Sequence, residues 1–87
     1  MEVIFKSEAL KDIEYWKNSR NTKVQKKITQ LIEDVCLHPF TGLGKPEPLK
    51  YNLSGCWSRR ITPEDRLVYE VVEGKVNILS LRGHYEK

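Results

Sequence analysis

The chain has 87 residues, of which 39% are hydrophobic and 31% are charged, and its formal net charge is +3. This length favours one domain, spanning residues 1–87, and the composition is ordinary for a globular protein. The excess of positive charge is mild for a nucleic-acid binder, so the placement of the cations matters more than their number. No apolar run is long enough to cross a bilayer or to act as a secretory signal. The sequence therefore predicts a cytoplasmic protein.

Two cysteines, Cys36 and Cys56, could form a disulfide. Because the sequence shows no secretory signal, we expect both to be reduced thiols in the core. Their spacing does not match that of a zinc site. We expect neither a metal ion nor another cofactor.

A short strand and a helix are predicted at the start of the chain. Val3-Ile4-Phe5 is a run of residues that favour strands. Ser7 is a suitable N-cap for the segment that follows, and we expect a helix over residues 8–19. Three apolar residues recur in it at helical spacing, which places the tryptophan in the core: Leu10, Ile13 and Trp16.

The second helix has the clearest pattern in the sequence. Thr22 and Gln25 form a Thr-x-x-Gln capping-box pattern at its start. His38-Pro39 ends it, because a residue before proline disfavours the helical conformation. Between these points, one apolar stripe at helical spacing consists of Val24, Ile28, Leu31, Ile32 and Val35.

The second half of the chain predicts strands connected by loops. Residues 40–56 are rich in glycine and proline, so we expect a loop with one short strand near residues 49–51. Thr62-Pro63-Glu64-Asp65 predicts a turn, and Glu73-Gly74 predicts a tight hairpin. Three longer strands are predicted, over residues 57–62, 66–73 and 76–81.

Alternation within the middle one of these three strands separates two faces of the predicted sheet. Leu67, Tyr69 and Val71 share one face, and Val68 and Val72 share the other. The elements follow in the order strand, helix, helix, and then three or four strands. This order predicts an α+β fold in which two N-terminal helices pack on one face of a small, mostly antiparallel twisted sheet.

One carboxylate, Glu47, stands between two prolines and is followed by several cations. Proline fixes its own φ and pushes the preceding residue out of the helical region, so Glu47 is expected on a stiff extended segment. A carboxylate held rigidly among cations is suited to act as a general base on an anionic substrate. The cations that follow it are Lys50, Arg59, Arg60 and Arg66.

A proton donor is expected at the other end of the chain. His84 lies at the end of the last predicted strand, beside Tyr85 and close to Arg82, where it could face a substrate. His38 is better explained as a cation favoured by the helix dipole. A carboxylate base, an arginine and a histidine acid suffice for metal-free RNA cleavage. Such a reaction leaves a 2′,3′-cyclic phosphate and a 5′-hydroxyl.

Each of these residues also has a purely structural explanation. A glutamate between prolines is most often a solvated turn residue, and a histidine near the end of a chain is usually a surface residue. Arg59-Arg60 is typical of an exposed strand edge with paired charges. Arg66, directly after a turn, is placed to pair with an acidic residue of that turn. Cations near Glu47 also lower the pKa of a carboxylate and weaken it as a base.

Several runs of the sequence are specific enough to compare with known families. They are Lys45-Pro46-Glu47-Pro48-Leu49-Lys50, Asn52-Leu53-Ser54-Gly55, Trp57-Ser58-Arg59-Arg60-Ile61, Arg66-Leu67-Val68-Tyr69 and His84-Tyr85. These runs resemble the YoeB/Txe family, whose members are toxins of bacterial type II toxin–antitoxin pairs within the RelE-like superfamily. The resemblance covers nearly the whole chain.

The resemblance implies an mRNA endoribonuclease that acts on message in the ribosomal A site. It assigns the general base to Glu47 and the general acid to His84. An arginine matching Arg66 stabilises the transition state, and a tyrosine matching Tyr85 helps to orient the nucleotide.

Cations and protein partners are implied as well. Lys50 and Arg60 are expected to hold RNA phosphates, and the neighbouring Arg59 is a further RNA-binding candidate. The family also implies a homodimer and a small acidic antitoxin whose disordered tail wraps the toxin. Two departures from the family stand out: residues 86–87 follow the His-Tyr pair that closes the relatives, and Cys56 stands where relatives carry a large aromatic residue.

Two other functions compete with RNA cleavage. A non-catalytic module could block translation by occupying the ribosome, and it would then produce no new 2′,3′-cyclic phosphate ends. A DNA-binding partner in a repressor complex is the third interpretation. It is the least favoured, because the sequence lacks a helix rich in arginine and asparagine that would suit a major groove.

Overall fold

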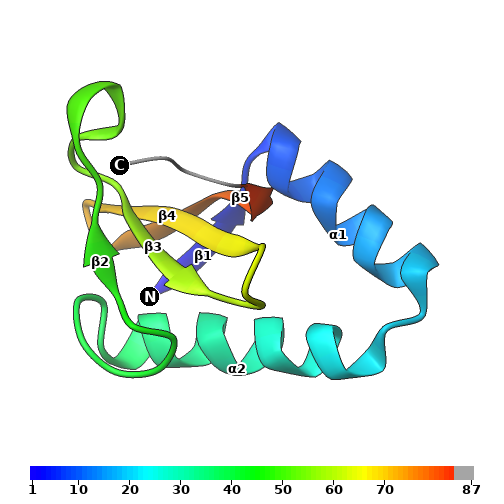
Figure 1. Ribbon diagram of the computed structural model, residues 1–87. Helices are drawn as coiled ribbons and strands as arrows, with labels where there is room; N and C mark the ends of the chain where they lie inside the picture. The colour runs from blue at the N-terminus through cyan, green and yellow to red at the C-terminus, as the bar shows by residue number, and fades with distance from the viewer. Residues whose placement is uncertain (84–87) are drawn as a thin grey trace.

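The computed structural model describes residues 1–83, which form two helices and a five-stranded sheet (Figure 1). In chain order the elements are β1 (Glu2–Phe5), α1 (Ser7–Ser19), α2 (Thr22–Leu37), β2 (Glu47–Pro48), the 3₁₀ helix η1 (Tyr51–Leu53), β3 (Trp57–Arg60), β4 (Arg66–Val72) and β5 (Lys75–Gly83). The strands lie in the order β1-β5-β4-β3-β2. β1 is parallel to β5 and all other neighbours are antiparallel. The predicted α+β class is therefore confirmed. In this part of the chain, neither α-helix is long and apolar enough to cross a membrane.

Helix α1 begins at Ser7, one residue before its predicted start. The prediction that Ser7 caps this helix is wrong, because Lys6 takes the N-cap position and its side chain forms no cap hydrogen bond. The predicted burial of Trp16 is confirmed. Leu10, which shares its helical spacing, is 56% exposed, and Ala9 is buried instead.

Two polar side chains of α1 bond the backbone of β5. Asp12 Oδ2 accepts from the backbone N–H of Leu81 at 2.8 Å, and Trp16 Nε1 donates to the Leu81 carbonyl at 3.0 Å. β1 pairs with β5 only as far as Ile78. Helix α1 thus satisfies backbone groups of β5 that lie beyond the end of β1, where an unpaired strand edge would otherwise be exposed. This role explains a buried aspartate on α1.

Helix α2 carries the predicted apolar stripe but not the predicted capping box. Its N-cap is Asn21, whose Oδ1 accepts from the backbone N–H of Val24 at 3.1 Å. Gln25 does not reach back to the helix start; its Nε2 donates to the Trp16 carbonyl at 2.9 Å and ties α2 to α1. The helix ends before His38, as predicted. Four members of the stripe are buried and the fifth packs against the core: Val24, Ile28, Leu31, Val35 and Ile32.

Both helices and one face of the sheet enclose a single core. The sheet contributes its predicted inward-facing residues of β4, Leu67 and Tyr69, with Val71 packed beside them. β5 adds Val76 and Ile78, which lie opposite Val71 and Tyr69. The Glu73-Gly74 hairpin joins the two strands as predicted, with positive φ at both residues. Burying one face of the sheet leaves its other face for polar side chains.

The segment between α2 and β3 differs from the prediction. The short strand is Glu47–Pro48 rather than residues 49–51. Tyr51 has a φ of +58°, in the left-handed region, so the chain turns there into a 3₁₀ helix instead of extending. β3 ends at Arg60, short of its predicted end, because the next two backbone N–H groups both donate to the Asp65 carbonyl and close the predicted turn.

The two cysteines are free thiols, as predicted. Cys56 is buried, and its burial raises the pKa of the thiol above its ordinary value. Cys36 is partly buried and packs against the core. Among residues 1–83, no group of three or more histidine, cysteine, aspartate or glutamate side chains could hold a metal ion.

Candidate active site

One face of the sheet, opposite the helices, gathers charged and polar side chains from three strands. In β3, Arg59 contacts α2, so Ser58 and Arg60 point the other way. The strand register places Glu47 of β2 opposite Ser58, and Arg66 of β4 opposite Arg60. We call this surface the site face and define it by Glu47, Ser58, Arg60 and Arg66.

Glu47 and Arg66 form an ion pair on the site face. Arg66 Nη1 lies 3.5 Å from Glu47 Oε1 and donates to Ser58 Oγ at 3.3 Å. The arginine side chain is 20% exposed and the glutamate side chain 33%, but the glutamate oxygen that faces the arginine, Oε1, is itself buried. Ser58 is fully buried. The structure therefore brings together two predicted catalytic residues, and it adds a serine that steadies the arginine.

Ser58 was not assigned a role from the sequence. The signal that could have found it is the alternation in β3, which puts Ser58 on the same face as Arg60 and opposite the strand that carries Glu47. That inference requires the register of β2 against β3. A strand as short as Glu47–Pro48 has too little pattern to reveal its register.

The backbone around Glu47 is fixed on both sides, as its flanking prolines predicted. After β2, the backbone N–H of Leu49 donates to the Cys56 carbonyl at 2.9 Å. Before β2, the Gly44 carbonyl accepts from the backbone N–H of Arg60 at 2.7 Å. The carboxylate is therefore carried by an extended segment that is attached to β3 at both ends.

The prediction that Arg59 binds RNA is wrong, because its side chain is fully buried between β3 and α2. Its Nη1 lies 2.5 Å from Asp34 Oδ2, and its Nε donates to the Tyr69 hydroxyl at 3.2 Å. The remaining bonds go to loop carbonyls, those of His38, Thr41 and Leu43. A guanidinium whose donors all point into the protein cannot contact a phosphate on the surface.

This network shifts the protonation of its members. The hydrogen bond from Arg59, supported by one from the backbone N–H of Leu43, holds the pKa of Asp34 below its ordinary value. Burial raises the pKa of Tyr69, and the hydrogen bond from Arg59 opposes that rise only in part. The Tyr69 hydroxyl donates in turn to the Pro39 carbonyl. At neutral pH the network consists of a charged pair and a neutral phenol.

The loop that joins α2 to β2 closes around the Arg59 guanidinium and needs two glycines to do so. Gly42 has a φ of +110°, and a Cβ there would lie 2.2 Å from Asp34 Oδ2. Gly44 has a φ of +77°, and a Cβ there would lie 2.8 Å from Leu31 Cδ2. Only glycine combines this backbone conformation with so close an approach. Arg59 is thus a buried anchor for the loop that leads into β2.

Two of the predicted RNA-binding cations remain at the surface. Arg60 is exposed and belongs to the site face, and Lys50 is exposed beside the start of η1. Both are free to meet an anionic ligand. The structure therefore distinguishes Arg60 from its buried neighbour, although both arginines were predicted to bind RNA.

The other predicted catalytic residues, His84 and Tyr85, lie outside the described residues. The described part of β5 ends at Gly83, which is the register partner of Arg66. The chain thus reaches its residue 83 directly opposite the arginine of the ion pair.

Two helices and a mixed five-stranded sheet, with a carboxylate–arginine pair on the face opposite the helices, define a small RelE-like α+β protein. Residues 5–85 match the family model described as the YoeB-like toxin of bacterial type II toxin–antitoxin systems. The toxin YoeB of Escherichia coli K12 is 49% identical over 85 residues, which are 98% of this chain and 100% of the relative. The chain therefore belongs to the YoeB-like toxin family.

Solved structures agree with this assignment. A YoeB/ParE toxin from Agrobacterium tumefaciens superimposes with a TM-score of 0.92 at 40% identity, covering 98% of this chain and 100% of the other. A YoeB–YefM complex from Staphylococcus aureus gives a TM-score of 0.87 at 40% identity. The YoeB dimer from the same organism gives 0.88 at 38% identity. Each Staphylococcus comparison covers 98% of both chains.

Proposed function

We propose that this toxin is a metal-independent endoribonuclease that cleaves mRNA in the ribosomal A site. The ion pair of Glu47 with Arg66 carries the proposal, since it joins a candidate base to a candidate phosphate-binding arginine and both side chains are partly exposed. Both residues match the family pattern. The pairing of Gly83 with Arg66 adds support, because His84 is the next residue in the chain.

In the proposed reaction, Glu47 takes the proton from a ribose 2′-hydroxyl, whose oxygen attacks the adjacent phosphorus. Arg66 stabilises the charge that develops on the phosphoryl oxygens. His84 gives its proton to the leaving 5′-oxygen, and Tyr85 orients the nucleotide. The products are a 2′,3′-cyclic phosphate and a 5′-hydroxyl.

The contact between Glu47 and Arg66 holds the two proposed catalytic groups 3.5 Å apart before a substrate binds. A bound phosphate would draw the Arg66 guanidinium toward itself, because charge-assisted hydrogen bonds to a phosphate are strong. We infer that Arg66 moves from Glu47 to the phosphate when the substrate binds.

The surface cations and the partners complete the proposal. Lys50 and Arg60 hold RNA phosphates beside the ion pair. The toxin works in the bacterial cytoplasm, forms a homodimer and is neutralised by an acidic antitoxin. The YoeB dimer and the YoeB–YefM complex of Staphylococcus aureus support these two protein partners.

The test is cleavage of an mRNA on programmed ribosomes, with the RNA ends identified chemically. Glu47→Gln keeps the shape of the side chain but removes the base, so we expect cleavage to fall at least about 100-fold, the usual scale for a general base. His84→Gln should give a similar loss. Glu73→Gln, an exposed carboxylate in the β4–β5 hairpin, is the matched control and should cleave like the unmodified toxin.

Two outcomes would contradict the proposal. Full cleavage by both Glu47→Gln and His84→Gln would remove the acid–base assignment. Inhibition of translation without any 2′,3′-cyclic phosphate ends would instead indicate a non-catalytic toxin that occupies the ribosome.

A further inference from the structure

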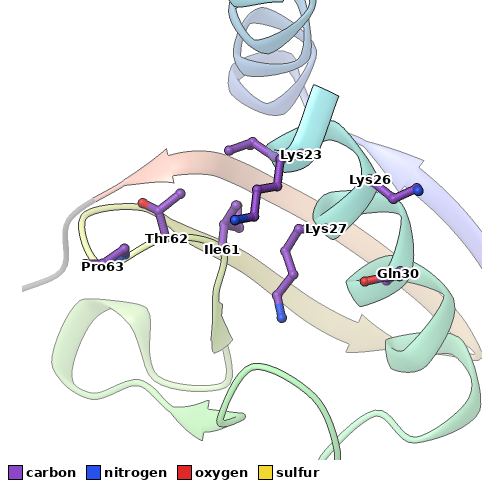
Figure 2. A pocket seen from close by; sticks show the side chains of 8 residues that line it. Lys23, Lys26, Lys27, Gln30, Ile61, Thr62 and Pro63 are labelled. Carbon is purple, nitrogen blue, oxygen red and sulfur yellow. The ribbon is translucent and has the colours of Figure 1, made fainter. Parts of the chain in front are cut away.

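A second basic feature lies on the helical side of the molecule. An open hollow of about 530 Å³ lies between α2 and the turn that joins β3 to β4. We call it the lysine hollow, and define it by Lys23, Lys26 and Lys27 on α2 and by Ile61 and Pro63 on the turn. Figure 2 shows Lys23 and Lys27 on the side of α2 that faces the turn, with Lys26 further round the helix.

The three lysines are placed at an electrostatic cost to the free protein. Lys26 and Lys27 stand three and four residues after Lys23, where like charges on a helix repel. No acidic residue stands three or four positions from any of the three. They also occupy the N-terminal half of α2, the positive end of the helix dipole, and the first turn holds no acidic residue. Such an arrangement gains by binding an anion.

Among residues 1–83, the acidic groups near the hollow form no ion pair with its lysines. Asp34, on the same flank of α2, pairs with Arg59. Glu64 and Asp65 follow in the β3–β4 turn, where their carboxylates lie 3.5 and 3.0 Å from Thr62 Oγ1. Within residues 1–83, the ion pairs are those of Arg59 and Arg66, so the three ammonium groups are available to a partner.

The chemistry of the hollow favours a phosphate backbone. Lysine ammonium groups act as point charges that neutralise phosphates without reading a base sequence. Lys23 and Lys27 stand about one helical turn apart, about 6 Å along the helix axis, so both can contact phosphates of one strand. The aliphatic floor offers little to a peptide, because Val24 and Ile61 are only 7% and 8% exposed. An acidic protein segment would gain charge pairing there but little apolar burial.

We propose that the lysine hollow is a sequence-independent binding site for an RNA phosphate backbone, separate from the site face. The proposal rests on the proposed function, because it assumes that RNA is the substrate. The β3–β4 turn, which forms one wall of the hollow, also connects Arg60 to Arg66 on the site face. An RNA held by these arginines would meet the lysine hollow next. The β3–β4 turn, which carries Glu64 and Asp65, separates the two basic surfaces.

The test uses the full-length chain and a fluorescent 2′-O-methyl oligoribonucleotide, which has no free 2′-hydroxyl to react. Binding is followed by fluorescence anisotropy over a range of salt concentrations. The test variant combines Lys23→Gln, Lys26→Gln and Lys27→Gln. The control combines Lys6→Gln, Lys11→Gln and Lys75→Gln, which are exposed lysines away from the hollow and remove the same net charge.

We expect the test variant to bind the oligonucleotide at least about tenfold more weakly at physiological salt. Its plot of log affinity against log salt should lose about 2 units of slope, since each phosphate contact on a single strand contributes about 0.7. The control should keep most of the slope. Thermal unfolding of the test variant should occur at the same or a higher temperature, because the substitutions remove like-charge repulsion.

Equal losses in both variants would overturn the proposal, because net charge alone would then explain binding. Unchanged RNA binding in the test variant would overturn it as well. A variant that keeps RNA binding but loses binding to poly-L-glutamate would assign the hollow to an acidic protein. Since the probe cannot be cleaved, these outcomes do not depend on catalysis, so failure here and failure of the proposed endoribonuclease activity are distinguishable.

Discussion

Adjacent arginines on β3 have opposite environments. Successive side chains of a strand point to opposite faces, so Arg59 enters the core side while Arg60 reaches the site face. Arg59 holds Asp34 and three loop carbonyls and thereby fixes the loop that leads to Glu47. Arg59 therefore affects the proposed reaction only indirectly, by positioning the loop that leads to Glu47. Arg60 is free to contact a ligand directly.

This difference predicts unequal effects on the free energy of unfolding. Arg59→Leu should lower the free energy of unfolding by about 3 kcal/mol or more, because it leaves Asp34 without its cation and buried carbonyls without donors. Arg60→Ala, its matched neighbour, should change it by no more than about 0.5 kcal/mol, as is usual for an exposed residue. Urea unfolding monitored by circular dichroism measures both. A loss below about 1 kcal/mol for Arg59→Leu would contradict the anchoring role.

At the scale of elements, the helices, β4 and the short first strand, predicted at residues 3–5 and found as Glu2–Phe5, were predictable, whereas the helix caps and the segment between α2 and β3 were not. The stripe of α2 and the alternation in β4 are local patterns, and both reappear in the core. The cap of α2 was assigned one residue too late because Asn21 and Thr22 are both suitable caps, and only the contact of Gln25 with α1 separates them. That contact is between two different helices, so it cannot be predicted from the residues around the cap alone.

The position of β2 depends on tertiary contacts in the same way. Its two residues pair with β3 because the preceding loop is wrapped around a buried arginine, and the sequence shows that arginine only as one of several cations. The two flanking prolines made it predictable that Glu47 is held on a stiff extended segment. Its contact with Arg66 and the support from Ser58 were not predictable, because they follow from strand register.

The loop before β2 gives a prediction at this scale. Gly44→Ala should destabilise the protein more than Gly74→Ala, although the two glycines have nearly equal φ values of +77° and +74°. Both substitutions incur about 1–2 kcal/mol for a left-handed alanine. At Gly44 the added Cβ also meets Leu31 Cδ2 at 2.8 Å and the Arg60 carbonyl at 3.1 Å, which adds about 1–3 kcal/mol of overpacking.

The comparison isolates packing from backbone strain, because nothing lies within 4 Å of a Cβ at Gly74. Thermal and urea unfolding of both variants give the difference directly. If both variants lost the same free energy of unfolding, the loop would be able to move aside without cost. The close approach of Gly44 to α2 and β3 would then not contribute to stability.

For the whole molecule, one polar network links the two layers of the fold. Arg59 comes from the sheet, Asp34 from α2 and Tyr69 from the central strand β4, and together they hold the loop that carries the site segment. A small domain has few other places to bury such a network. The stability of the molecule should therefore depend on pH through the groups that titrate within it.

The direction of that dependence follows from the two pKa shifts. The pKa of Asp34 is lower in the folded chain than in the unfolded chain, so its stabilisation is complete above the unfolded value of about 4 and is lost as pH falls through the folded value. The pKa of Tyr69 is raised by burial, so its contribution is complete below about pH 10 and is lost as pH rises through the folded value.

Urea unfolding across the pH range tests this assignment with two variants. Asp34→Asn should flatten the loss of stability at acidic pH, and Tyr69→Phe should flatten the loss at alkaline pH, each without removing the other. Glu33→Gln replaces an exposed carboxylate beside Asp34 and should keep the acidic limb of the unmodified protein. If Asp34→Asn kept the full acidic limb, the acid sensitivity would arise outside the Arg59 network, since an amide at that position has no proton to gain.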